Sequence, residues 1–257
     1  MKWPCNFLVI ILLLPLTLLG LTTSVAIPCY YKHFPYLMDL LQHLACQTKM
    51  PEEVVIALSQ VEELDPALVD SLEGNSWPFR LLVLRREGVW MEGSNRTLAA
   101  RSTSQEVVLC IDADDIPHPQ RIEAVCSFFE TVQEANFVLT GHAYCPGNSI
   151  ICEPTIPFFS GEEYVQLRFD LTRQYWDPLH TMQDLTRWDS GIHNGSPSFR
   201  RNLLDRELFW TDRKNGADLE FNAKVLESGV QGYLLTLPLI HYYNQRSSGN
   251  DVGRGSI

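Results

Sequence analysis

Between Val107 and Pro119 the sequence reads Val-Val-Leu-Cys-Ile-Asp-Ala-Asp-Asp-Ile-Pro-His-Pro, an apolar run that ends in a cluster of acids. The five leading apolar residues predict a buried strand. The carboxylates of Asp112, Asp114 and Asp115 follow it within four positions. Like charges this close repel one another unless something positive lies among them. A hard divalent cation, Mg²⁺ or Mn²⁺, is the natural candidate, because such ions prefer oxygen ligands and often share them with phosphate.

Length and composition indicate one large α/β domain. The 257 residues are 45% hydrophobic and 20% charged, which is ordinary for a globular chain with a full core. The formal net charge of -11 argues against a nucleic-acid backbone as the main partner. Seven cysteines are scattered without a CxxC pair, so no zinc site is indicated. Cys110 and Cys126 are expected to be buried free thiols.

Strands and helices are expected to alternate along the chain, which predicts a parallel sheet with right-handed crossovers. The strands are expected at 24–29, 54–58, 79–84, 107–111, 137–140 and 233–240, and the helices at 36–46, 66–72, 95–102, 119–132 and 218–228. Ser94 is the expected cap of the third helix. The stretch 144–189 is less regular and is expected to cover a site. Ligands bind beyond the carboxyl ends of strands in such sheets, where the acid cluster falls.

The N-terminus carries an apolar run from Phe7 to Leu21 after Lys2. It is typical of a signal peptide, with a small-x-small cleavage site ending at Ala26, or of a membrane anchor. These two alternatives predict membrane association or the secretory pathway. The third is an apolar segment packed on a cytoplasmic domain. The expected organisation is therefore an apolar segment at 1–21, a domain at 22–245 and a flexible tail at 246–257.

The order of these pieces resembles the family-2 glycosyltransferases of the GT-A fold over most of residues 22–245. The matching motifs lie at 24–30, 40–47, 51–56, 94–97, 111–119, 199–201 and 215–221. Among them, Ile-Asp-Ala-Asp-Asp-Ile-Pro-His-Pro is the best match and contains the DXD pattern. The resemblance implies a Rossmann-type nucleotide-diphospho-sugar transferase fold, with a mostly parallel central sheet flanked by helices.

The resemblance also implies a metal-dependent, inverting transfer of a sugar from a nucleotide-sugar, with a UDP-sugar as the expected donor. The acceptor would be a hydroxyl of a glycan, a lipid or a protein. Asp114 is the expected main ligand of Mn²⁺ or Mg²⁺, with Asp112 and His241 as further ligands. Asp218 is the expected general base. The nucleotide-sugar is expected to contact Pro28, Arg96 and Asp112, and the guanidinium of Arg96 matches phosphate geometry.

Each of these residues also has a structural interpretation. The three aspartates could form a turn or a helix cap, and Asp218 could be an N-cap. His241 could be structural, and Arg96 could lie on a solvated helix face. Two other functions stay open. A catalytically impaired sugar- or nucleotide-binding protein is suggested by Ser59 and Ala217, which replace acids that the family usually carries. A haloacid-dehalogenase-like phosphatase would need later lysine and paired-aspartate motifs, and no paired aspartates follow.

Overall fold

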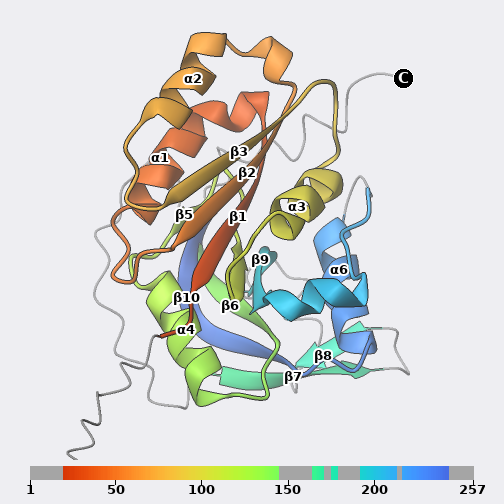
Figure 1. Cartoon of the computed structure of the whole chain (residues 1–257). Helices are drawn as coiled ribbons and strands as arrows, with labels where there is room; N and C mark the ends of the chain where they lie inside the picture. The colour runs from red at the N-terminus through yellow and green to blue at the C-terminus, as the bar shows by residue number, and fades with distance from the viewer. Residues whose placement is uncertain (1–19, 145–163, 171–174, 179–191, 213–215, 243–257) are drawn as a thin grey trace, which may run out of the picture.

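A computed structural model describes residues 20–144, 164–170, 175–178, 192–212 and 216–242 (Figure 1). The strands of these residues form one mixed sheet, in the order β3-β2-β1-β4-β9-β6-β10-β7-β8, and β5 pairs with β10. The strands are β1 (Thr23–Tyr30), β2 (Glu53–Ser59), β3 (Arg80–Arg86), β4 (Val107–Cys110), β5 (Ile116–Pro117), β6 (Phe137–Tyr144), β7 (Tyr164–Asp170), β8 (Tyr175–Pro178), β9 (Ile192–Arg200) and β10 (Gly232–Tyr242).

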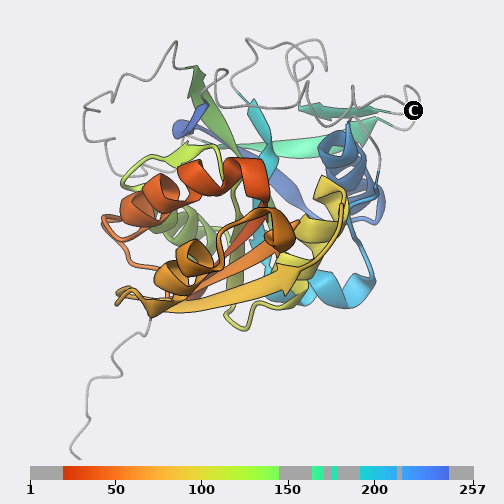
Figure 2. The same cartoon turned by 90° about the horizontal axis from the view of Figure 1, so that it is seen from above.

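Helices cover both faces of the sheet, and each face has its own apolar cluster. The helices are α1 (Phe34–Leu44), α2 (Pro66–Gly74), α3 (Glu92–Arg101), α4 (Arg121–Thr131) and α6 (Ala217–Glu227), with 3-10 turns η1 (Tyr31–His33), η2 (Val61–Glu63) and η3 (Arg201–Arg206). Helices α1, α2 and α4 pack on one face, and α3, η3 and α6 pack on the other. Both views show α3 and α6 side by side (Figures 1 and 2).

The α/β fold expected from the sequence is confirmed, and its sheet is parallel in one half. Strands β3, β2, β1 and β4 run parallel, as their alternation with helices predicts. Strand β9 then runs antiparallel between β4 and β6, and β7 and β8 extend the other edge antiparallel. The sequence predicts no strand at β9 and irregular chain where β7 and β8 lie. These two predictions are wrong, because the strands form by pairing with their neighbours and carry no local apolar periodicity.

Of two expected local features, the helix cap at Ser94 is wrong and the two buried thiols are confirmed. Met91, not Ser94, is the residue before α3, and the helix begins at Glu92. Ser94 instead donates its backbone N–H and its hydroxyl to Asp212, at 2.9 and 2.6 Å. Cys110 and Cys126 are free and buried, as expected.

The first strand bears on the expected processing of the N-terminus. Ala26 lies fully buried in β1, opposite Val55 on one side and Cys110 on the other. Cleavage after Ala26 would remove half of this central strand. Among the described residues no helix is long and apolar enough to cross a membrane, and residues 1–19 lie outside them.

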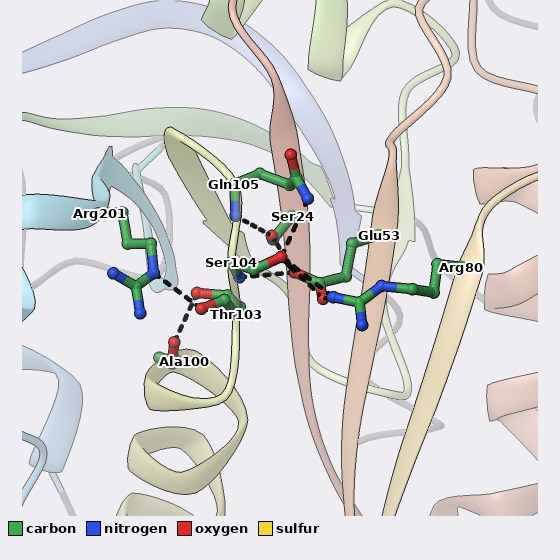
Figure 3. Close-up of polar contacts among 8 residues, drawn as sticks. All are labelled: Ser24, Glu53, Arg80, Ala100, Thr103, Ser104, Gln105 and Arg201. Carbon is green, nitrogen blue, oxygen red and sulfur yellow. Dashed lines mark hydrogen bonds and ion pairs between the residues drawn. The ribbon is translucent and has the colours of Figure 1, made fainter.

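A buried carboxylate connects the parallel strands β1, β2 and β3 at their amino ends (Figure 3). Glu53 is fully buried and accepts hydrogen bonds from the Ser24 hydroxyl at 2.5 Å and the Ser104 backbone N–H at 2.7 Å. The Arg80 guanidinium completes the cluster with an ion pair to Glu53. Ser24, Glu53 and Arg80 are register partners across β1, β2 and β3. This polar cluster therefore fixes the amino ends of the strands, at the edge opposite the acid cluster.

Candidate active site

The three aspartates form a turn directly after β4. The backbone N–H of Asp115 donates to the carbonyl of Asp112 at 3.1 Å, and the side chains of Asp114 and Asp115 are largely buried. Burial raises the pKa of Asp114 well above its ordinary value, and the negative charges of Asp115 and Asp112 raise it further. The negative form of Asp114 is therefore disfavoured here, and a positive charge beside it would favour that form.

Arg96 supplies positive charge on the other side of the turn. Its side chain is fully buried in α3 and forms ion pairs with Asp112, Asp218 and Glu92. Burial alone would lower the pKa of Arg96, but the charges of Asp112 and Glu92 outweigh it and raise the pKa. Arg96 thus brings an acid of the β4 turn and an acid of α6 to one guanidinium.

Asp218 is placed for more than capping. Gly216 is the residue before α6, in the left-handed conformation, and Asp218 lies in the first turn with its carboxylate on Arg96. The N-cap interpretation of Asp218 is therefore wrong. The hydrogen bonds from Ser94 to Asp212 tie the preceding segment to the start of α3. Helix α3 consequently holds the chain that carries Asp218 at two points.

A second buried arginine, which was not predicted from the sequence, joins the strand before this turn to β9. Arg121, the first residue of α4, is 1% exposed and donates to the carbonyls of Cys110 at 2.8 Å and Ser196 at 3.1 Å. Burial lowers the pKa of Arg121 to about 10, against the opposing charges of Asp115 and Asp112, so it stays cationic at neutral pH. Its position after Pro119, at a helix start behind the acids, was the available signal.

Two histidines lie near the acid turn. The His33 Nδ1 atom is 3.9 Å from Asp114 Oδ1. Burial lowers the pKa of His33 to about 4, although the charge of Asp112 opposes the shift, so His33 is neutral at pH 7. His241 is buried on β10 opposite Ile116, and its ring lies 6.3 Å from that of His118. Burial and then His43 lower the pKa of His241, whereas Asp115 opposes them.

The donor set partly fits the divalent cation that the sequence suggests. Asp112 and Asp114 offer the carboxylate oxygens that hard cations prefer. In the part of the chain that the structure describes, no three histidine, cysteine or acidic side chains are arranged to hold one metal ion. Ligation by Asp112, Asp114 and His241 together therefore stays a prediction. Pro28 is buried in β1 opposite Ala57, and its contact with a nucleotide also stays a prediction.

The sequence and the fold of this chain match those of known glycosyltransferases. The model of the family described as "Glycosyl transferase family 2" matches residues 24–203, from β1 through β9 into η3. The chain belongs to glycosyl transferase family 2. This confirms the resemblance and leaves no support for the phosphatase alternative.

Solved structures of S. aureus TarS share the fold. The TarS 1–349 complex with UDP-GlcNAc is 17% identical, with a TM-score of 0.62 over 87% of this chain and 58% of that one. The complex with UDP is 16% identical, with a TM-score of 0.61 over 86% of this chain and 60% of that one. This chain thus spans about three-fifths of the TarS chains in these two complexes. No curated protein sequence matches it.

Proposed function

We propose that this chain is a glycosyltransferase that moves a sugar from a nucleotide-sugar, with a UDP-sugar as the donor, to a hydroxyl acceptor on a glycan, a lipid or a protein. The observation that carries the proposal is the convergence of Asp112 and Asp218 on Arg96, in a chain of glycosyl transferase family 2. The complexes of TarS with UDP and UDP-GlcNAc support the choice of uridine.

In the proposed reaction, Asp218 accepts the proton of the acceptor hydroxyl while the hydroxyl oxygen attacks the anomeric carbon. The bond from that carbon to the diphosphate breaks, and its electron pair leaves with the diphosphate. One displacement of this kind inverts the configuration of the sugar. Asp218 is a quarter exposed and sits in the first turn of α6, so it is accessible to solvent.

Asp114 and Asp112 would hold a Mn²⁺ or Mg²⁺ ion, and His241 would have to move towards them to become a third ligand. Bound there, the ion supplies positive charge that stabilises the leaving diphosphate. The raised pKa of Asp114 supports this assignment, because such a carboxyl gains most from a cation beside it. Arg96 would orient the donor by binding its diphosphate, and the guanidinium would then give up part of the contact with Asp112.

Donor binding gives the decisive test. Isothermal titration with UDP, UDP-GlcNAc, UDP-glucose and GDP-mannose, each with MnCl₂, should give heat for at least one uridine nucleotide. Asp114→Asn should abolish the metal-dependent part of that binding. Absence of binding by the wild-type protein to every nucleotide in the panel, with Mn²⁺ or Mg²⁺, would refute the proposal.

A second candidate is a transferase-fold protein that binds the donor without turnover. Ser59, at the end of β2, and Ala217, the first residue of α6, replace acids that the family usually carries. The hydroxyl of Ser59 accepts a hydrogen bond from the side-chain amide of Asn95 at 2.8 Å, so a neutral polar group occupies the position of the usual acid. Metal-dependent binding of UDP without hydrolysis or transfer across an acceptor panel would favour this candidate.

We also propose that the apolar N-terminal segment directs the chain to a membrane or to the secretory pathway. Its sequence supports this, and the position of Ala26 within β1 favours retention of the segment over cleavage after Ala26. Fractionation of cells that express the full chain tests the proposal, since recovery in the soluble cytoplasmic fraction alone would contradict it.

A further inference from the structure

Gly195 lies in β9 at the point where the acids meet. It is buried, and a methyl group built on its α-carbon would lie 2.7 Å from Asp112 Oδ2. The same methyl group would lie 3.4 Å from Arg96 Nη2 and 3.4 Å from Asp218 Oδ2. Because Gly195 has no side chain, the three charged groups can all lie close to its backbone.

The nature of the clash separates Gly195 from glycines that the fold itself requires. At Gly93 an added methyl group would lie 2.2 Å from the backbone carbonyl oxygen of Thr211, which cannot move without moving the chain. At Gly195 the nearest atom is the end of the Asp112 side chain. The folded structure can therefore accept a methyl group at 195 by moving the Asp112 carboxylate.

Hydrogen bonds hold the backbone next to Gly195 in place, so we expect the Asp112 side chain to move rather than this backbone. Arg121 donates to the carbonyl of Ser196, the next residue, at 3.1 Å and to the carbonyl of Cys110 at 2.8 Å. Cys110 ends β4, two residues before Asp112. A single guanidinium thus joins the strand that carries Gly195 to the strand that leads into Asp112.

We propose that Gly195 is a positioning residue: its lack of a side chain sets where the Asp112 carboxylate lies relative to Asp218. This rests on the proposed function, in which Asp112 serves the donor and Asp218 serves the acceptor. A methyl group would have to push Asp112 Oδ2 outward by 0.7 Å to reach the ordinary contact of 3.4 Å. Because the two oxygens belong to one carboxylate, this movement also shifts Asp112 Oδ1, which is paired with Arg96.

Gly195→Ala should weaken the binding of UDP with MnCl₂ by about tenfold and lower donor turnover by about 10- to 100-fold, since misplacement by about 1 Å can cost about a hundredfold. Gly74→Ala is the matched control, because Gly74 ends α2 with nothing within 4 Å of an added methyl group. It should leave both quantities unchanged. Equal UDP affinity and turnover in Gly195→Ala and wild-type protein would overturn the inference.

A double-mutant cycle separates positioning from a general loss of structure. In an Asp112→Ala background the clash has no partner, so Gly195→Ala should cause no further loss of UDP affinity. The same cycle can be measured without any ligand, by the melting temperature. Gly195→Ala should lower the melting temperature of the wild-type protein. In the Asp112→Ala background, Gly195→Ala should leave the melting temperature unchanged or raise it. Equal losses in both backgrounds would overturn the inference.

The two proposals fail in different ways. If the wild-type protein binds no nucleotide, the proposed function fails, while the melting-temperature cycle still decides whether Gly195 acts through Asp112. If the wild-type protein binds UDP and the cycle shows no coupling, the role of Gly195 fails and the proposed function stands.

Discussion

Replacing Arg96 with methionine should destabilise the protein strongly, because three carboxylates would lose the positive charge that they share. The guanidinium is 0% exposed, whereas the carboxylates of Asp112 and Asp218 are 24% and 26% exposed. Removing one partner of a fully buried ion pair costs about 3–5 kcal/mol. Because water reaches a quarter of each carboxylate, we expect a loss near the lower end, about 3 kcal/mol.

Urea unfolding of the metal-free protein at pH 7 measures this loss. For a chain of this size it corresponds to a fall in melting temperature of about 6–12 °C. Arg85→Met is the matched control, because Arg85 is 39% exposed and pairs with Asp70 and Glu73 at the surface. An exposed cluster of this kind contributes about 0–1 kcal/mol.

The effect must also depend on the acids. In an Asp112→Asn, Asp218→Asn background the cost of Arg96→Met should fall by more than half, because the guanidinium then has one charged partner left, the exposed Glu92. A loss below about 1 kcal/mol, or an equal loss in both backgrounds, would refute the claim that the acids and Arg96 stabilise one another.

Three further outcomes are expected. Glu53→Gln should cost about 2–4 kcal/mol in urea unfolding, yet leave UDP affinity in calorimetry unchanged, because Glu53 is buried at the other edge of the sheet. His33 has its pKa lowered to about 4 by burial, so the folded state binds fewer protons than the unfolded state. Stability should therefore fall as the pH drops from about 6.5 towards 4, by up to roughly 3 kcal/mol, and His33→Gln should flatten this dependence in urea midpoints. Asp114 has its pKa raised by burial, so stability should fall as the pH rises from about 4 towards the folded pKa. Asp114→Asn should raise the melting temperature of the metal-free protein at pH 7 and abolish its increase with Mn²⁺.

The parallel half of the sheet could be predicted because its strands carry their own signal. Residues 54–58 and 107–110 are continuous apolar runs, and the structure buries all of them. Strand β9 carries no such signal, since Ile-His-Asn-Gly-Ser-Pro-Ser-Phe-Arg holds few residues that favour strands. It is extended because β4 and β6 pair with it on either side. Such a strand depends on partners far away in sequence and was missed for that reason.

The acids of the site and Arg96 were identified from the sequence, but the sequence did not show that arginines lie beside the acids as their counter-charges. Like charges at 112, 114 and 115 imply something positive nearby, and the sequence alone suggested a metal ion. The structure places two arginines there, and Arg121 bonds to carbonyls of residues 110 and 196, which only the folded chain brings together. Helix periodicity marks the apolar face of α4 and gives no reason to bury a charged first residue.

The two arginines do not make a cation superfluous, because among the described residues their ion pairs and hydrogen bonds go to groups other than Asp114. Arg96 forms ion pairs with Asp112 and Asp218, and Arg121 donates its two hydrogen bonds to backbone carbonyls. Asp114 keeps a raised pKa in their presence, with neutral His33 as a neighbour at 3.9 Å. A raised pKa marks a carboxyl whose negative form is poorly balanced by positive charge in its folded position. The remaining deficit lies at Asp114, the position where the proposed function requires a divalent ion.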